Sequence, residues 1–362
     1  MLPAPPGPLG DVARLFLLLG SIGFGGPAAH IALMEREVVT KRGWLDRQRF
    51  LTLVGASQLI PGPNSTELAI HIGYARAGWP GLVVAGACFI LPAVALVSLA
   101  AAAYQAYGSV PAVTAVFAGV APVVLAIVTE AGRRLGGTAL DGPLPIACFL
   151  AAAVAGWVGV PELAVILGAA AIGALLHWGR PHVATAGAIV LADPTAIFGL
   201  FARIGAVLVG SGYVLLAFLR TALVEQRGWL TERQLLDAIA IGQATPGPVF
   251  TTATFVGWLL AGPIGAAAAT VGIFLPAFIF VAITAPFLDR VASSALGRQV
   301  LRAVTAASLA LLLVVTIRLA GAAWGAWWGM PLTALSFALL RSGRTSPTVV
   351  IGLGALVGLL AT

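Results

Sequence analysis

The feature that most constrains the fold is a pair of long segments without a charged side chain. Residues 77–129 contain no Asp, Glu, Lys or Arg, and neither do residues 238–288. A membrane-spanning helix needs about 20 predominantly apolar residues, so each segment has room for two spans. Charged residues make up 9% of the whole chain, against roughly 25% in soluble domains. The chain is therefore a polytopic integral membrane protein.

The chain also carries one unusual motif twice. Arg42-Gly43-Trp44-Leu45 is followed by Pro61-Gly62-Pro63, and Arg227-Gly228-Trp229-Leu230 is followed by Pro246-Gly247-Pro248. Matched positions lie 185 residues apart (247 − 62 = 185), and the offset becomes 184 further along each half. Breaks at corresponding positions of two halves of a membrane protein are the best sequence indication of a transporter's binding site.

The apolar runs predict an all-α fold of about twelve spans. They divide into two homologous transporter repeats, residues 9–190 and 194–362. The segments 50–76 and 235–260 contain the Pro-Gly-Pro motifs, and we expect them to be broken or re-entrant helices. The runs at 144–158, 183–191 and 347–361 are short for a membrane span.

Each Pro-Gly-Pro motif predicts the start of a half-helix, with its second proline in the first turn. Two prolines around a glycine stop a helix, whereas proline fits the first turn of a new one. Non-helical backbone at membrane depth is found where it is buried in protein or lines a cavity, and a helix start attracts anions. The alternative is a plain kink, in which Ser and Thr bond back to backbone carbonyls.

Hydroxyl and amide side chains follow both breaks, and they suit an oxyanion. A glycine-rich interruption upstream, at Gly25 and Gly26, allows close approach of a ligand or of another helix. The predicted substrate-binding residues are Gly25, Gly26, Gln58, Pro61, Gly62, Pro63, Asn64, Ser65, Thr66, Gln243, Thr245, Pro246, Gly247, Pro248, Thr251 and Thr252.

Glu67 is the only acidic residue between Asp46 and Glu130. Intramembrane carboxylates are expensive and usually functional, and proton coupling is one option. Arg76 could pair with Glu67 or with the substrate, since Arg is the natural partner of oxyanions. Both are candidate coupling residues; the alternative for Glu67 is a carboxylate stabilised at a half-helix start. The second half has Thr252 in its place, so the role would be asymmetric.

Other classes of function have little support. The net charge of +7 is dispersed among short loops, which is typical of topogenic charges rather than of a nucleic-acid surface. The four His and two Cys residues show no metal-ligand spacing, and no His and acidic cluster suggests a membrane-embedded enzyme. Nothing resembles the selectivity filter of a channel. We expect a transporter with no enzymatic activity, no metal, no cofactor and no nucleic-acid partner.

Several of these motifs resemble those of the chromate ion transporter (CHR) family in its long two-domain form: Phe24-Gly25-Gly26-Pro27, Arg42 to Leu45, Pro61 to Thr66, Gly73-Tyr74, Phe89 to Pro92, Gln243 to Pro248 and Phe274-Leu275-Pro276. The resemblance covers nearly the whole chain. It implies that the protein exports chromate and thereby confers chromate resistance, and that sulfate, the related tetrahedral dianion, is a further possible substrate. It also implies that the two halves form inverted repeats.

The expected location is the inner (plasma) membrane, as a multi-pass protein, and assembly as a homodimer is an option. The second half departs from the first at Val249 and Phe250, where the first has Asn64 and Ser65, so the two breaks need not contact substrate equally. A transporter or exchanger for another small anion is the alternative function.

Overall fold

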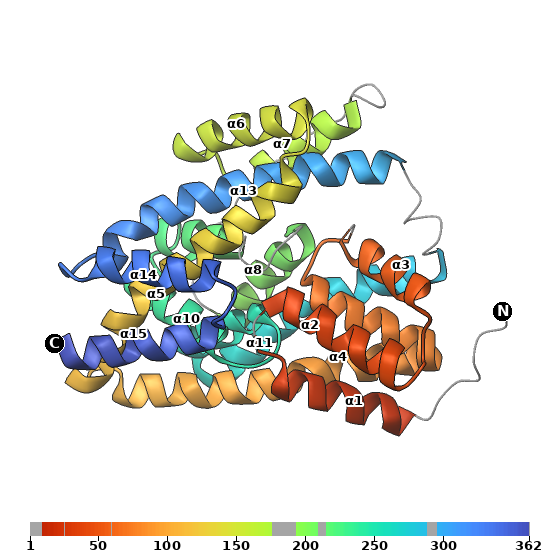
Figure 1. The fold of residues 1–362 in the computed structure, drawn as a ribbon, viewed down its shortest axis with the longest axis horizontal. Helices are drawn as coiled ribbons and strands as arrows, with labels where there is room; N and C mark the ends of the chain where they lie inside the picture. Colours follow the sequence, from red (N-terminus) through yellow and green to blue (C-terminus); the bar gives the residue numbers. More distant parts are fainter. Residues whose placement is uncertain are drawn as a thin grey trace. The chain divides into compact units, whose positions relative to one another are not determined.

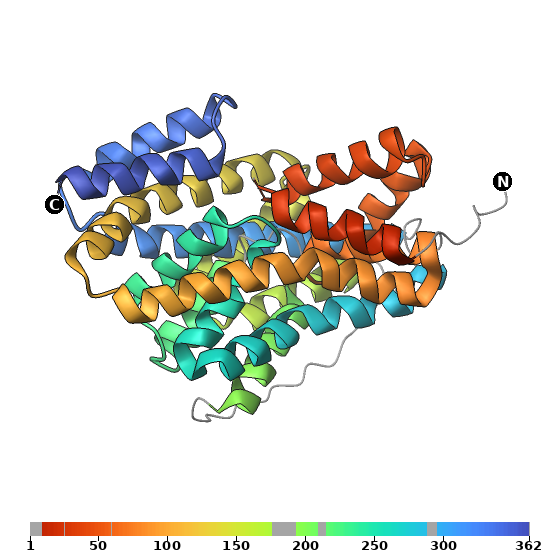
Figure 2. The ribbon, with the colours of Figure 1, turned by 90° about the horizontal axis from the view of Figure 1, so that it is seen from below.

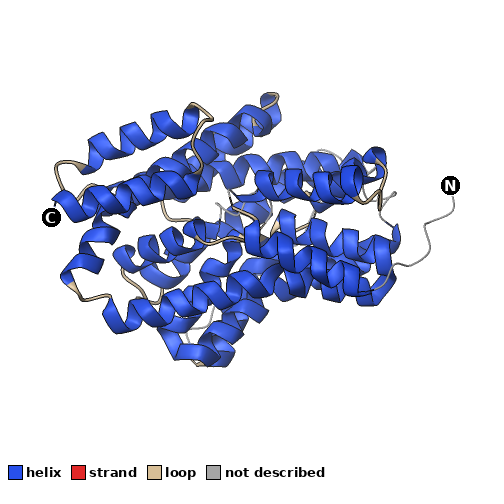
Figure 3. Cartoon of the chain, turned by 60° about the horizontal axis from the view of Figure 1, so that its bottom comes forward, coloured by secondary structure: helices blue, strands red, loops and turns tan. Residues whose placement is uncertain are grey.

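The computed structural model describes residues 9–24, 26–58, 60–175, 193–208, 215–287 and 295–361. Throughout these residues the secondary structure is helical, without a β-strand (Figure 3). Among the described residues, four helical segments are long and apolar enough to cross a membrane: Asn64–Tyr107, Pro111–Gly137, Val249–Phe287 and Arg302–Ala323. These findings confirm the predicted all-α, multi-pass fold. The predicted run at 183–191 lies outside the described residues.

The chain forms two compact units, and each unit takes segments from both halves of the sequence. Unit 1 comprises Met1–Ala101, Pro194–Gly212 and Thr245–Ser294, and unit 2 comprises Ala102–Asp193, Tyr213–Ala244 and Ala295–Thr362. The compact units therefore do not coincide with the two sequence halves.

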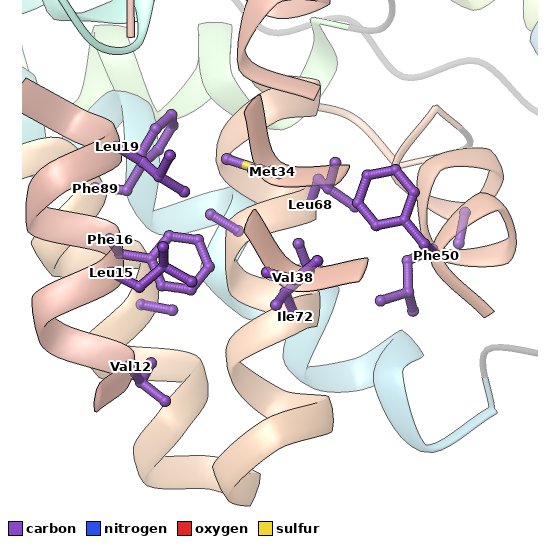
Figure 4. Close-up of a cluster of buried hydrophobic side chains, with 14 residues drawn as sticks. Val12, Leu15, Phe16, Leu19, Met34, Val38, Phe50, Leu68, Ile72 and Phe89 are labelled. Carbon is purple, nitrogen blue, oxygen red and sulfur yellow. The ribbon is translucent and has the colours of Figure 1, made fainter. Parts of the chain in front are cut away.

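Unit 1 contains the N-terminal helices and the two long helices that follow the Pro-Gly-Pro breaks (Figure 1). Its core is formed by apolar side chains of the first half, among them Phe16, Phe50 and Phe89, which are fully buried (Figure 4). The elements are α1 (Leu9–Ile22), α2 (Gly26–Glu35), the π-helical η1 (Arg36–Lys41), α3 (Arg47–Ser57), most of α4 (Asn64–Tyr107), α8 (Pro194–Val207), η3 (Val249–Thr251), α11 (Thr252–Thr284) and η4 (Ala285–Phe287).

Both α4 and α11 are helical hairpins rather than single straight helices. The backbone leaves helical geometry at Ala77-Gly78 and again at Ala261-Gly262, where Gly78 has φ +61° and Gly262 has φ +59°. In each hairpin the arms fold back on one another. A Cβ atom built on Gly73 would collide with Cβ of Ala85 in α4, and the hydroxyls of Thr254 and Thr270 in α11 are hydrogen-bonded at 2.7 Å.

The first arm of α4, residues 64–77, is a half-helix. At 1.5 Å per residue it is about 21 Å long, which is shorter than the hydrocarbon core of about 30 Å. Helix α4 begins at Asn64 and the short η3 turn begins at Val249, so each second proline directly precedes the new helix instead of lying in its first turn. The predicted broken segments are therefore present, and their position is shifted by one residue.

The return arms of the two hairpins run antiparallel. Gly86 lies against the ring of Phe278, and Leu82 belongs to the same apolar cluster as Val281 and Ala285. Residue numbers thus fall along one arm as they rise along the other, as the α4 and α11 ribbons show in Figure 2. Equivalent arms of the two halves therefore have opposite directions within unit 1.

Unit 2 is built on two long helices, α5 (Pro111–Ala139) and α13 (Ala295–Ala323), which are equivalent at the offset of 184 (295 − 111 = 184). Helix α5 packs against α14 and α15, whereas α13 packs against α6 and α7. The long helix of each half is thus held by the helix pair of the other half. The remaining elements are α6 (Pro143–Trp157), α7 (Glu162–Leu175), α9 (Leu215–Leu219), the π-helical η2 (Arg220–Glu225), α10 (Glu232–Ala244), α14 (Gly329–Arg341) and α15 (Pro347–Ala361).

Candidate functional site

Both Pro-Gly-Pro breaks lie in unit 1, and each is bound to the interrupted helix of the other half. The N–H of Gly62 donates a hydrogen bond to the carbonyl oxygen of Leu208 at 2.7 Å. The N–H of Gly247 donates to the carbonyl oxygen of Gly23 at 2.9 Å. Positions 23 and 208 are equivalent at the offset of 185, as are 62 and 247, so the two hydrogen bonds are copies of one contact.

The packing around the two glycines repeats this reciprocity. A Cβ atom built on Gly62 would lie 3.2 Å from Cβ of Ala277 in α11, and one built on Gly247 would lie 2.7 Å from Cβ of Ala93 in α4. Ala93 and Ala277 are themselves equivalent positions. Each half thus supplies both the break glycine of one contact and the opposing alanine of the other. Such reciprocal contacts indicate a two-fold relation, as at the isologous interface of a symmetric dimer. The two breaks are therefore related by a pseudo-two-fold axis.

His30 stabilises one of the two interrupted helices. Its Nε2 is 2.8 Å from the Gly23 carbonyl oxygen, which also accepts the N–H of Gly247. Of the predicted glycines in this segment, Gly26 begins α2 with φ +78°, and Gly25 lies outside the described residues.

The first break is rich in buried polar atoms without partners. Ser65, Thr66 and Glu67 are 3%, 0% and 0% exposed. Within the described ranges no hydrogen-bond partner is found for Oδ1 of Asn64, Oγ1 of Thr66 or either carboxyl oxygen of Glu67. The amides of Thr66 and Glu67 donate to the carbonyl of Pro63, at 2.7 and 3.1 Å. At this half-helix start two backbone amides are therefore bonded within the turn, whereas side-chain oxygens of Asn64, Thr66 and Glu67 have no partner among the described residues.

The second break has a different local structure. The hydroxyl of Thr251 donates to the Pro248 carbonyl and that of Thr252 to the Val249 carbonyl, each at 2.8 Å. Both threonines are fully buried. Phe250 packs near Phe274, with ring centroids 6.3 Å apart. Here the hydroxyls adopt the back-bonded arrangement that the sequence offered as the alternative to substrate contact.

The other predicted site residues have varied environments. Pro63, Pro246 and Pro248 are buried, Pro61 and Thr245 are half-buried, and Gln58 is exposed after the end of α3. Gln243 belongs to unit 2, at the end of α10, and is buried with its side-chain Nε2 unpartnered among the described residues.

Arg76 is placed near the repeated Trp loop. Its guanidinium lies 5.0 Å from the ring centroid of Trp44, over which Arg42 also stacks at 5.8 Å. In the second half Arg227 stacks over Trp229 at 5.3 Å, so the Arg and Trp pair recurs in both loops. Stacked Arg and Trp pairs of this kind suit the membrane interface, where Trp side chains are enriched.

The loop of the first half carries its own ion-pair cluster. Glu37, whose side chain is 6% exposed, accepts a hydrogen bond from Lys41 at 2.7 Å and also pairs with Arg42. The hydrogen bond from Lys41 lowers the pKa of Glu37 below its ordinary value, burial opposes that change, and the hydrogen bond from Arg42 adds to it.

One further residue of the half-helix was not selected from the sequence. His71 is 2% exposed, and its Nε2 has no partner among the residues that the structure describes. It lies four positions after Glu67, and residues at this spacing share a helix face. The spacing is visible in the sequence, but a single His in an apolar segment is not a specific signal.

Unit 2 contains a separate polar cavity of about 30 Å³, large enough for water molecules only. Arg220 and Arg318 both pair with Glu225 at its wall. Burial raises the pKa of Glu162, which accepts a hydrogen bond from the hydroxyl of Thr221. The described residues include no group of three or more His, Cys, Asp or Glu side chains that could hold a metal ion.

The fold and the site define a polytopic helical membrane protein with two homologous halves and two reciprocally packed breaks. The chain belongs to the chromate transporter family, whose model matches residues 10–174 and again residues 195–359. No solved structure is significantly similar to the chain.

Three curated relatives carry names of the same kind. A chromate transport protein of Pseudomonas aeruginosa is 33% identical, over 87% of this chain and 82% of the relative. A probable chromate transport protein of Synechococcus elongatus is 32% identical, over 78% of this chain and 77% of the relative. A chromate transport protein of Cupriavidus metallidurans is 29% identical, over 99% of this chain and 94% of the relative.

Proposed function

We propose that this protein transports chromate across the inner membrane of a bacterial cell, outward from the cytoplasm. Membership of the chromate transporter family and the names of its relatives support the substrate. The observation that carries a transport mechanism is the reciprocal binding of the two breaks, Gly62 to Leu208 and Gly247 to Gly23. Transport by this route requires no covalent chemistry and no cofactor.

We place the substrate between the two half-helix starts. A dianion that leaves water must receive equally strong donors in return, since a buried charge without them is very costly. Thr66, Asn64 and Ser65 supply donors at the first break, and the dipole of the half-helix adds a positive end. Sulfate has the same shape and charge, and we propose it as a second substrate.

The structure shows the amides of both break glycines occupied by backbone carbonyls. We propose that these two hydrogen bonds open in turn while the anion is bound, so that the amide of Gly62 faces the substrate in one state and the amide of Gly247 in the other. A pair of equivalent contacts, of which one opens while the other stays closed, would expose the site to one side at a time. This mechanism fits two repeats, residues 9–190 and 194–362, that are inverted in the membrane.

Reconstituted protein tests the proposal. Proteoliposomes loaded with chromate should take up labelled chromate by counterflow, sulfate should compete, and small carboxylates should not. Gly62→Val should abolish counterflow, because its side chain would collide with the carboxyl of Glu67. Gly43→Val is the matched control: Gly43 also has positive φ, +59°, but nothing lies within 4 Å of its Cβ position.

Expression in a chromate-sensitive host tests the direction. Cells with the protein in their membrane should accumulate less chromium than cells with the Gly62→Val variant. Equal accumulation at equal protein levels would refute export. Counterflow of a carboxylate but not of chromate would instead favour a transporter for another small anion.

A further inference from the structure

Glu67 carries a fully buried carboxyl group. It is 0% exposed, and neither carboxyl oxygen has a hydrogen-bond partner within the described part of the chain. The side chain turns back toward the break, because a Cβ atom on Gly62 would collide with its Oε1. An ionised carboxylate in such a place is very costly, so its charge must be removed by a proton or balanced by a cation.

The elements around Glu67 do not balance its charge. Helix α11, which supplies Ala277 to the packing at Gly62, contains no titratable side chain from Thr252 to Thr284. Neither carboxyl oxygen of Glu67 accepts a hydrogen bond from a charged side chain of the described residues. On its own helix His71, four residues further on, is the titratable neighbour.

The two halves differ at these positions. The equivalents of Glu67 and His71 at the offset of 185 are Thr252 and Val256. The hydroxyl of Thr252 is already used, because it donates to the Val249 carbonyl at 2.8 Å. An unpartnered titratable group is therefore present at the first break and absent from the described part of the second.

We propose that Glu67 is a proton-binding site through which this protein carries one proton together with each chromate dianion, in the same direction. The proposal rests on the proposed function, and it assigns different tasks to the two breaks. The second break contributes to anion binding alone, whereas the first contributes to anion binding and binds the coupling proton.

The direction of coupling follows from electrostatics. A dianion at the first break repels an ionised Glu67, and binding of a proton to Oε1 or Oε2 removes that repulsion. Protonation and anion binding therefore favour one another, and by linkage each raises the affinity for the other. Two ligands that bind together are carried together. Counter-transport would require the proton and the anion to weaken each other's binding. The electrostatic coupling at Glu67 has the opposite effect.

The test uses purified protein in proteoliposomes with a pH-sensitive dye in the lumen. The membrane potential is clamped at zero with potassium and valinomycin, and the pH is kept above the second ionisation of chromate so that the anion itself carries no proton. Chromate is added outside, and chromate uptake and lumenal pH are recorded together. Glu67→Gln is compared with wild type, and Glu35→Gln is the matched control because Glu35 pairs with Arg47 outside the break, at 3.4 Å.

With wild-type protein we expect the lumen to become more acidic as chromate enters, and an imposed inward proton gradient to accelerate uptake. With Glu67→Gln both effects should be lost while chromate counterflow remains measurable, and Glu35→Gln should behave as wild type. Chromate uptake without acidification, or uptake that depends on sodium instead, would overturn the proton proposal and leave chromate transport standing. Absence of chromate movement in wild type would overturn both.

Discussion

The contact between Gly247 and Ala93 predicts a specific rescue. Gly247 has φ +94°, a conformation that costs an L-residue about 1–3 kcal/mol. The added methyl of Gly247→Ala would also lie 2.7 Å from Cβ of Ala93 and 3.2 Å from the carbonyl oxygen of Gly20. Overpacking of this kind costs about 1–3 kcal/mol. The substitution should therefore lower the free energy of unfolding by about 2–6 kcal/mol.

Removal of the opposing methyl should recover part of this loss. Ala93→Gly alone costs about 1 kcal/mol, because glycine is less favourable than alanine within a helix. Combined with Gly247→Ala it removes the closest contact, so the double variant should regain about 1–3 kcal/mol relative to the sum of the single effects. The strain from the positive φ should remain. Gly262→Ala measures that strain alone, since Gly262 has φ +59° and open space at its Cβ position.

Equilibrium unfolding of the purified variants in mixed micelles, followed by circular dichroism, gives the four free energies of the cycle. Chromate counterflow of the same preparations shows whether the break recovers its function with its stability. Additive effects of the two substitutions would show that Gly247 and Ala93 do not touch. That result would refute the reciprocal packing of the two breaks.

Three further predictions concern single positions. Thr66→Ala should raise the KM for chromate in transport assays because its hydroxyl is unpartnered, whereas Thr252→Ala, whose hydroxyl bonds to backbone, should leave KM near the wild-type value; equal effects would contradict the asymmetry. Cysteines at Arg42 and Arg227 should react with an impermeant reagent from opposite sides of the membrane, and labelling from one side would refute inverted repeats. Glu37→Gln should lower stability by about 1 kcal/mol at neutral pH. In the wild type the stabilisation by ionised Glu37 should begin to be lost below pH 4.5, the ordinary pKa, and should be gone once the pH is below the lowered pKa of Glu37 in the folded protein. The stabilities of the two proteins should therefore converge in acid.

Much of the architecture could be predicted from the sequence because its causes are local. Hydropathy fixes which segments can enter a membrane, and two prolines around a glycine, as at residues 61–63 and 246–248, interrupt a helix. The equivalence of the two halves was visible from the motif spacing alone, and the repeated match to the family model bears it out.

The contacts between halves could not be predicted in the same way. Nothing near Gly62 in the sequence indicates that its amide meets the carbonyl of Leu208, because that contact depends on how distant helices pack. The hydroxyl of Thr251 illustrates a second limit of sequence patterns. A threonine at a helix start can face a ligand or bond back to the chain, and the residues around it in the sequence do not decide between the two.

The exchange of helix pairs between the halves has a consequence for biosynthesis. When the ribosome has completed α7, α5 still lacks α14 and α15, and the first break lacks the carbonyl of Leu208. Neither compact unit can close at that stage, so the first half must wait in the bilayer as loosely associated helices until the second half has been inserted. Folding of both units is then a late, joint event. A gene divided after the codon for Leu175 should accordingly yield two fragments that are degraded when made separately and are stable when made together.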